Sequence, residues 1–512
     1  MAEQKQPIQG ASLALLTLSL SLATFMQVLD TSIANVSIPT IAGDLAVSPD
    51  QGTWVITSFA VSNAIALPLS GWLAKRFGEV RLFIAATLLF TVASMLCGLS
   101  SSLPMLVVFR IFQGAVAGPM IPLSQSLLLV NYPHEKKGLA LALWSMTVVL
   151  APIFGPILGG YITDNFSWPW IFYINIPVGL MSTYITWQLL KDRETLIHKL
   201  PIDVAGLILL VAGVGSLQLL LDKGNDLDWF NSDTIRILAV ISTISLSFFI
   251  LWELTDRHPV VDLSLFKVRN FSVGTIAISL GSMTFFAGVV VYPLWLQTQM
   301  GYTATWAGLS AAPIGILSVI FSPIVGKNMH KIDLRILASF SFLVFAGIAF
   351  WASSFNTGAA FWQLTLPRFF QGIGMATFFI PLMSILLSGL PPDRVASASG
   401  LSNFLRVLGG SFGTSLSVAL WNRRESLHHS QLTENISISD PVTNHVLDSL
   451  HSMGLGHMPS LALLEGEVSS QSYMLAVNDV FIASAWIFLA LMFFVWFARP
   501  PFAAGKASGG EH

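Results

Sequence analysis

Residues 109–114 read Phe-Arg-Ile-Phe-Gln-Gly, and 258 positions later residues 367–372 read Pro-Arg-Phe-Phe-Gln-Gly. The same offset relates two further pairs of landmarks, Tyr132-Pro133 with Leu390-Pro391 and Phe154-Gly155 with Phe412-Gly413. An offset kept over three landmarks is hard to reach by chance. The sequence therefore predicts two copies of one structural unit.

The composition around these copies indicates a membrane protein. Of 512 residues, 54% are hydrophobic and only 10% are charged, whereas about a quarter are charged in soluble domains. Apolar windows of the length that a transmembrane helix needs recur along the chain. We expect an all-α membrane protein with 14 spans, near residues 12–36, 52–74, 82–100, 104–129, 138–161, 170–190, 203–221, 234–254, 271–297, 304–325, 335–354, 361–387, 395–421 and 476–497.

Several kinds of chemistry have no support in the sequence. Cys97 is the only cysteine, and all ten histidines lie outside the predicted spans, so neither a cysteine metal site nor haem ligation is expected. The chain has no phosphate-binding glycine loop with a lysine. A net charge of −2 gives no basic surface for nucleic acid. We expect no cofactor, no metal and no enzyme activity.

Lysine and arginine positions predict the orientation. Eighteen of the 25 fall in alternate gaps that include both ends of the chain, four fall in the opposite gaps, and three lie within spans. Because positively charged loops stay in the cytoplasm, both termini are predicted to be cytoplasmic. The copies then share one orientation, and two helices are inserted between six-helix halves. The predicted divisions are an N-terminus (1–11), a first half (12–190), the inserted helices (203–254), a second half (271–497) and a tail (498–512).

Two charged residues within the spans of the first half are candidates for proton coupling. An ionised carboxylate at Asp30, late in the first span, is unfavourable in lipid, so a protonated form near neutral pH becomes accessible, as a proton carrier requires. The alternative is an interfacial carboxylate at the outer end of the helix. Arg110 cannot lose its charge, so it needs an acceptor or a water-filled cavity inside the bundle. Its repeat partner Arg368 could instead simply stabilise its own half.

A second candidate is the stretch 151–160, Ala-Pro-Ile-Phe-Gly-Pro-Ile-Leu-Gly-Gly. Ala151, Gly155 and Gly159 lie four residues apart, which places small side chains on one helix face and allows another helix to approach closely. Two prolines in the stretch remove amide donors and allow a bend. We expect a hinge, with ordinary tight packing as the alternative. The candidate hinge residues are Pro152, Gly155, Pro156, Gly159 and Gly160.

The remaining candidates lie at span ends or have no evident partner. The basic turn 71–81 is a candidate gating loop through Gly71, Lys75, Arg76, Gly78 and Arg81, although a plain positive-inside turn would also explain its charges. Asp222 ends the seventh span, where an outer-interface position is the simpler interpretation. Arg406 is a third charge within a span. Residues 422–475 form a long polar outer loop, which is either functional or a disordered spacer.

These motifs resemble those of the major facilitator superfamily, and in particular its 14-span drug:proton antiporters of the EmrB/QacA type. The resemblance covers residues 22–502 and rests on the first-span Leu29-Asp30 stretch, on Arg110, on the 151–160 antiporter motif and on the run 168–179. It implies two six-helix halves and proton-coupled export. Lys75 departs from the pattern, because the superfamily usually has an aspartate there, and Glu79 stands at a usually basic position. The gating charge pattern of the superfamily therefore cannot be carried over intact.

The resemblance is strongest to EmrB-type proteins, through residues 21–27, 52–59 and 119–129. It implies export of hydrophobic or amphiphilic toxic compounds across the bacterial inner membrane. It also implies two protein partners, a periplasmic adaptor of the EmrA type and a TolC-type outer-membrane channel. An exporter of fatty acids or of another endogenous amphiphile, and a solute symporter of the same fold, remain the alternatives.

Overall fold

The computed structural model describes residues 8–133, 136–197, 201, 203–256, 259–434, 436 and 440–502. The described residues form helices and no strands, as the sequence predicts. Most of the predicted N-terminal segment and most of the predicted tail, residues 1–7 and 503–512, lie outside them.

The first half consists of helices that follow the predicted spans closely. They are α1 (Gly10–Asp44), the short α2 (Pro49–Gly52), α3 (Trp54–Phe77), α4 (Glu79–Gly98), α5 (Leu103–Ala117), α6 (Met120–Asn131), α7 (Lys137–Asn165), α8 (Trp170–Tyr173) and α9 (Asn175–Leu190). Helix α1 packs along α7 and α9, and α3 packs along α5. Helices α5 and α6 together occupy one predicted span.

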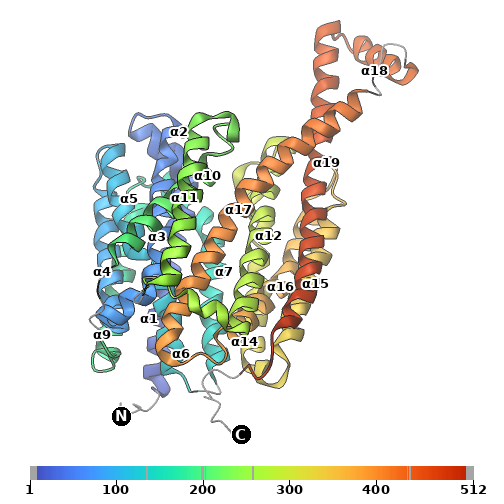
Figure 1. The fold of residues 1–512 in the computed structure, drawn as a ribbon. Coiled ribbons are helices and arrows are strands. Elements are labelled where there is room, and N and C mark those ends of the chain that lie inside the picture. The colour runs from blue at the N-terminus through green and yellow to red at the C-terminus, as the bar shows by residue number, and fades with distance from the viewer. Residues whose placement is uncertain are drawn as a thin grey trace.

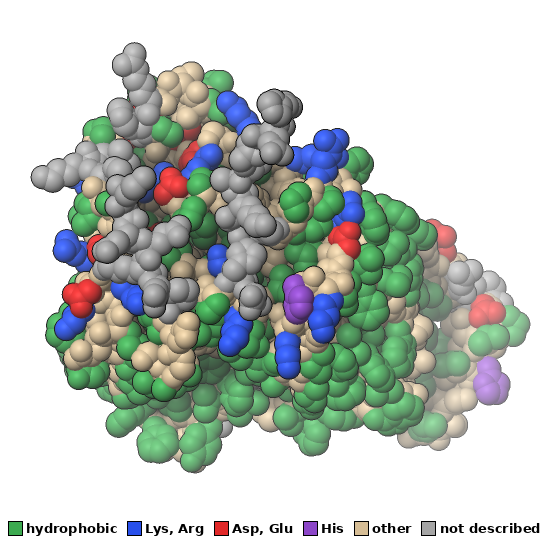
Figure 2. Space-filling model, turned by 90° about the horizontal axis from the view of Figure 1, so that it is seen from below, with side chains coloured by type: hydrophobic (Ala, Val, Ile, Leu, Met, Phe, Trp, Pro, Cys, Tyr) green, Lys and Arg blue, Asp and Glu red, His purple; other side chains and the backbone are tan. Residues whose placement is uncertain are grey.

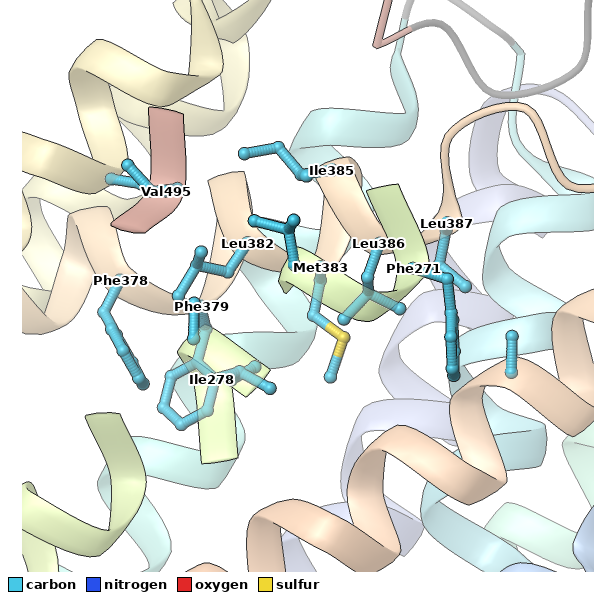
Figure 3. Packing of buried hydrophobic residues seen from close by; sticks show 14 of the residues in the cluster. Phe271, Ile278, Phe378, Phe379, Leu382, Met383, Ile385, Leu386, Leu387 and Val495 are labelled. Atoms are coloured by element: carbon cyan, nitrogen blue, oxygen red, sulfur yellow. The ribbon is translucent and has the colours of Figure 1, made fainter. Parts of the chain in front are cut away.

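The second half repeats this arrangement. It contains η3 (Leu263–Lys267), α12 (Arg269–Gln299), α13 (Ala304–Ala311), α14 (Ile314–Asn328), η4 (Met329–Lys331), α15 (Leu334–Ala352), α16 (Phe361–Leu387), α17 (Pro392–Thr433), α18 (Pro441–Ser452), α19 (His457–Phe494) and η5 (Val495–Phe497). Its core lies between α12 and α16, where Phe271 and Ile278 pack with Phe378, Leu382 and neighbouring side chains (Figure 3). Helices α16, α17 and α19 are longer than α5, α7 and α9 of the first half.

The inserted pair consists of α10 (Val204–Lys223) and α11 (Asp233–Thr255), with η2 (Trp229–Asn231) between them. Helix α10 packs against α3 of the first half and α17 of the second, so it lies beside the boundary between the halves (Figure 1). Helix α11 packs mainly on α10 and leaves most of its apolar surface exposed. A lipid-facing helix of this kind needs no polar partner.

Eleven described segments are long and apolar enough to cross a membrane, and bent α7 raises the number to 12. The other two predicted spans are also helical. Helices α8 and α9 divide residues 170–190 into two shorter pieces. Helix α17 is rich in serine and glycine and carries Arg406, which makes it more polar than a typical span. The count of 14 spans stays a prediction.

Basic side chains gather on the face of the bundle that Figure 2 shows, which is the end where η5 and the start of α1 lie. We call it the basic end. The two halves touch there: Gly71 of α3 lies against Ser397 of α17 so closely that a Cβ atom at Gly71 would collide with the serine. Nearby, Gln125 of α6 accepts hydrogen bonds from Ser399 (2.9 Å) and Asn403 (3.0 Å) of α17.

The segment 422–475 differs from the expected loop because most of it is helical. Helix α17 continues to Thr433, α19 already begins at His457, and α18 lies between them at the end of the molecule opposite the basic end (Figure 1). The sequence contains a start signal for α18, because the Asp440 side chain accepts a hydrogen bond from the Thr443 amide (2.9 Å). Polar helices lack the apolar windows that identify spans, so a search for such windows assigns them to a loop.

Candidate functional site

Asp30 and Arg110 form a buried ion pair between α1 and α5. The Arg110 Nη1 lies 2.5 Å from the Asp30 Oδ2, and the side chains of Arg110 and Asp30 are 0% and 1% exposed. The Arg110 Nε donates to the Val55 carbonyl of α3 (2.9 Å), and its guanidinium lies 4.3 Å from the centre of the Phe59 ring. The sequence predicts that Arg110 needs an acceptor inside the bundle, and the structure identifies Asp30 as that acceptor.

Two amide side chains complete the site around Asp30. The Oδ1 of Asp30 accepts from the Gln113 Nε2 (3.2 Å) and the Asn175 Nδ2 (2.9 Å), and Arg110 also donates to the Gln113 Oε1 (2.7 Å). Asn175 also donates to the Ser94 hydroxyl (2.9 Å). Site roles for Gln113, Asn175 and Ser94 were not predicted from the sequence. Amides in otherwise apolar spans were the available signal, because such groups need buried partners.

In this arrangement, binding of a proton by Asp30 would replace its ion pair with Arg110. Among the described residues, the hydrogen bonds to the Asp30 carboxylate all come from N–H groups, and such donors suit an ionised carboxylate. A proton on Asp30 removes the negative charge that holds Arg110 in place. Arg110 keeps its charge, and the Val55 carbonyl and the Gln113 Oε1 then remain as its acceptors. Protonation of Asp30 would therefore weaken the ion pair that joins α1 to α5.

The stripe of small residues on α7 faces α1 one helical turn or less from Asp30. A Cβ atom at Gly155 would collide with Ser32, and one at Gly159 would come within 3.2 Å of the Ile33 carbonyl. Nothing lies within 4 Å of such an atom at Gly160, so that glycine contributes no close approach. The predicted small-residue face therefore exists, and it is the face that touches the helix of Asp30.

The prolines of the stripe change the backbone of α7. Its two parts, Lys137–Pro152 and Ile157–Thr163, are inclined by 43°. Residue 156 has no amide hydrogen to give to the Pro152 carbonyl, and the Ser32 hydroxyl donates to that carbonyl instead (3.2 Å). The side chain of Pro156 lies outside the described residues. A bend thus occurs where the sequence predicts a hinge.

The repeat partner of Arg110 has different neighbours. Arg368 of α16 donates to the Gln371 Oε1 (2.9 Å), as Arg110 does to Gln113. Its guanidinium lies 4.0 Å from the centre of the Tyr292 ring of α12, and none of the ion pairs among the described residues includes it. The repeat conserves the arginine and the glutamine but not the carboxylate.

The other two charges of the spans lie near the boundary between the halves. Arg406 of α17 donates from its Nε to the Asn403 Oδ1 (3.2 Å), and Asn403 in turn donates to Gln125 of the first half. Asp222 of α10 accepts a hydrogen bond from Thr57 of α3. Neither residue contacts the Asp30 site. Asp222 instead attaches the inserted pair to the first half.

A carboxylate from a distant part of the sequence lies close to the basic turn 71–81. Asp262, in the linker between α11 and α12, accepts from the Nη2 of Arg394 at the start of α17 (2.7 Å). Burial raises the pKa of Asp262, but hydrogen bonds from Ser264 and Arg394 and the charges of Arg394 and Lys75 outweigh this effect, so the pKa lies below its usual value. Lys75 and Asp262 line one small cavity. Asp262 thus supplies negative charge close to the position where Lys75 replaces the usual aspartate.

The rest of the turn has a structural role. Gly78 has a φ of +89°, which favours glycine, and the Glu194 carboxylate packs against it. Glu194 accepts hydrogen bonds from the backbone amides of Val80 (3.0 Å) and Arg81 (2.8 Å), so it caps α4. The side chain of Arg76 lies against the rings of Trp72 and Phe77.

Comparison with known proteins agrees with this architecture. The model of the Major Facilitator Superfamily matches residues 20–414. The chain belongs to the major facilitator superfamily. Among solved structures, the proton:xylose symporter XylE covers 94% of this chain with a TM-score of 0.57 at 16% identity, and human MFSD10 covers 95% with a TM-score of 0.57 at 12% identity. At these identities the likeness concerns the fold alone.

Sequence relatives place the chain in the EmrB-like group of the superfamily. It is 54% identical to the multidrug export protein EmrB of Escherichia coli K12, over all of both chains. It is 50% identical to the fatty acid resistance protein FarB of Neisseria gonorrhoeae, over 99% of each. The family resemblance inferred from the motifs is therefore confirmed.

Proposed function

We propose that this protein is a proton-coupled multidrug efflux antiporter of the bacterial inner membrane, which exports hydrophobic or amphiphilic toxic compounds. The observation that carries the proposal is the buried Asp30–Arg110 pair, a titratable group held against a fixed charge, in a chain 54% identical to EmrB over its full length. Such a pair is costly to bury and is usually retained for a function. The protein needs no cofactor, since the proton gradient supplies the energy.

Two moving elements complete the proposed cycle. Protonation of Asp30 loosens the contact of α1 with α5, and bent α7, packed on Ser32, transmits the change toward the second half. The basic end is the closed gate in this conformation, held by Gly71 against Ser397 and by Asp262 on Arg394. Opening of this gate would expose the drug site to the cytoplasm.

The test is drug uptake into inverted membrane vesicles that contain the protein. We expect an acid-inside pH gradient to drive accumulation of a fluorescent hydrophobic drug, and a protonophore to release it. Accumulation that needs ATP or sodium, and ignores the protonophore, would rule out proton coupling.

The clustering of basic residues at one end of the bundle supports a proposed orientation in the membrane, since positively charged loops stay in the cytoplasm. The proposed cytoplasmic side is therefore the basic end, and α18 lies in the periplasm. Reporter fusions after Arg193 and Lys331 should report a cytoplasmic position, and a fusion after Leu450 should report an outer position. A cytoplasmic signal at Leu450 would overturn the proposed topology.

FarB supports a narrower alternative. A relative named for fatty acid resistance is 50% identical over nearly the whole chain, so a fatty acid or another endogenous amphiphile could be the main cargo. Export of a panel of neutral, cationic and anionic amphiphiles separates the two functions. A multidrug exporter accepts compounds without a carboxylate, whereas a dedicated fatty acid exporter does not.

The proposed protein partners are a periplasmic adaptor of the EmrA type and, through it, a TolC-type outer-membrane channel. The outer extension formed by α18 and the start of α19 supports adaptor docking there, because it exposes large apolar side chains such as Val442 (69%), Met453 (76%) and Met458 (72%). Solvent-exposed apolar clusters of this kind often mark interaction sites.

Replacement of residues 440–455 by a short Gly/Ser linker tests this docking. Transport in inverted vesicles should survive, because the deleted part lies away from the Asp30 site, whereas whole-cell resistance and co-purification of the adaptor should be lost. If both persist, the adaptor binds elsewhere on the molecule.

A further inference from the structure

A chain of hydrogen bonds leads from the Asp30 carboxylate to a break between two helices. Asn175, the first residue of α9, donates from its Nδ2 both to the Asp30 Oδ1 (2.9 Å) and to the Ser94 hydroxyl of α4 (2.9 Å). The Ser94 hydroxyl in turn donates to the Phe172 carbonyl of α8 (3.0 Å). All four residues are buried. We call this chain of hydrogen bonds the Asn175 relay.

The Asn175 relay ends where the backbone of the helix is interrupted. Helix α8 ends at Tyr173 and α9 begins at Asn175, so Ile174 alone separates them. Pro177 has no amide hydrogen to give to the Tyr173 carbonyl four residues earlier, which explains an interruption at this point. Helix α8 packs against α1, α4 and bent α7. A change at the relay would therefore reach the helix in which the sequence predicts a hinge.

The charge of Asp30 fixes the present direction of the relay. An ionised carboxylate only accepts hydrogen bonds, so the amide of Asn175 must turn its nitrogen toward it. The second hydrogen on that nitrogen goes to the Ser94 oxygen, and the hydrogen of Ser94 is then free for the Phe172 carbonyl. Each donor in the relay thus depends on the group before it.

A proton on Asp30 would reverse these roles. The Asp30 Oδ2 faces the Arg110 cation, so Oδ1 is the oxygen that can take a proton, and it then becomes a donor. The Gln113 Oε1 cannot accept this hydrogen bond, because it already accepts from Arg110 (2.7 Å) and from the Cys97 thiol (3.5 Å). Among the described residues, both side-chain hydrogen bonds of Asn175 use its nitrogen. A half-turn of its amide therefore brings an acceptor oxygen to Asp30.

We propose that Asn175 senses the protonation of Asp30 by this half-turn and passes it to the break between α8 and α9. After the half-turn, the Asn175 oxygen accepts from both protonated Asp30 and Ser94. The Ser94 hydroxyl then leaves the Phe172 carbonyl, and the end of α8 loses that hydrogen bond. Asn175 and Ser94 are thus positioning residues for proton coupling. This inference rests on the proposed function, since it needs Asp30 to bind the coupling proton.

The test is hydrogen–deuterium exchange of the backbone at the break, measured by mass spectrometry on the full-length protein in phosphatidylcholine nanodiscs at pH 8. Asp30→Asn places an amide N–H where the protonated carboxyl has its O–H, so it mimics the protonated state without a change of pH. It should raise the exchange rate in residues 168–180 about fivefold above that of the wild-type protein, as the loss of one hydrogen bond allows.

Ser94→Ala cuts the relay without touching Asp30. Its break should already exchange as fast as that of Asp30→Asn, and the double variant should exchange no faster. Ser182→Ala is the matched control, because Ser182 is equally buried and donates from α9 to the Ser19 carbonyl of α1 (2.9 Å), outside the relay. It should leave the effect of Asp30→Asn intact. Ser94→Cys keeps the size of the side chain with a much weaker donor, so it replaces Ser94→Ala if that variant fails to fold.

Three results would overturn the proposal: equal exchange at the break in the wild-type protein and Asp30→Asn, a full effect of Asp30→Asn in the Ser94→Ala background, or loss of the effect in the Ser182→Ala background. A failure of the export function itself is distinguishable, because the exchange measurement requires no transport. A wild-type protein that accumulates no drug under a pH gradient would reject the export function, whereas the exchange rates test the relay by themselves.

Discussion

The two halves contain the same Arg–Gln pair, Arg110 with Gln113 and Arg368 with Gln371, but the side chains around the two pairs differ. In the first half, Arg110 contacts Asp30 of α1, and the amides of Gln113 and Asn175 surround that carboxylate. In the second half, Arg368 stacks on Tyr292 of α12, and no carboxylate of the described residues pairs with it. The helix that carries the arginine is thus conserved between copies, and its partner helix has diverged. We therefore propose that the coupling proton binds in the first half.

A second pair of repeat positions, Gly155 and Gly413, keeps its helix contact in both halves. Gly155 of α7 lies against Ser32 of α1, and its repeat partner Gly413 of α17 lies against Met283 of α12. The close approach is therefore kept in both halves, although the second half has lost the surrounding motif. What it lacks are the prolines: α7 bends by 43°, whereas α17 is one continuous helix from Pro392 to Thr433. The bend, and not the close packing, is particular to the first half.

The largest expected difference concerns stability. Arg110→Gln leaves the Asp30 carboxylate buried without its cation, which should lower the free energy of unfolding by about 3–5 kcal/mol. Arg368→Gln removes a cation that donates a hydrogen bond to the neutral Gln371 amide, and should cost about 1 kcal/mol or less. Unfolding of both variants in mixed micelles measures the difference. Equal losses would mean that the two arginines are equivalent structural residues.

The next comparison uses the two glycines. Gly413→Ala should destabilise the protein by about 1–3 kcal/mol, because the new Cβ meets the Met283 carbonyl, a backbone atom that cannot turn aside. Gly155→Ala meets the Ser32 side chain first, and should cost less. Gly155→Leu should nevertheless stall export at normal membrane levels. Normal turnover of Gly155→Leu would leave the stripe with a packing role only.

The helices and the individual charged residues could be predicted from the sequence, but most of the contacts between them could not. Apolar windows and the repeat predict the spans and single out Asp30 and Arg110. Periodicity does not say which helices are in contact, so the Asp30–Arg110 pair and the contact of Asn175 with Asp30 could be identified only from the structure. Asp262 was missed for a similar reason. It lies in a polar linker, and only the fold brings it to Arg394 and close to Lys75.

The smallest expected effect concerns the gate at the basic end. Because the pKa of Asp262 is held below its usual value, its contribution should be complete at neutral pH and should disappear only as the pH falls below about 4. Asp262→Asn should therefore favour the open gate modestly, by about 1 kcal/mol or less for a partly exposed pair. Spin labels at Phe77 and Pro392, in a chain with Cys97→Ser, would report the opening as a longer distance. An unchanged distance distribution would remove Asp262 from the gate.

The most direct test of the difference between the halves is transport by Asp30→Asn in proteoliposomes. This variant keeps the size of the side chain and removes its titratable proton. The double variant Asp30→Asn/Arg110→Gln, which removes both charges of the pair, controls for lost stability. We predict that a pH gradient drives drug accumulation in the wild-type protein and in Arg368→Gln with a cationic drug, but in neither Asp30 variant, while exchange of labelled drug without a gradient persists in all of them. Gradient-driven accumulation by Asp30→Asn at the wild-type level would contradict the assignment of the proton to the first half.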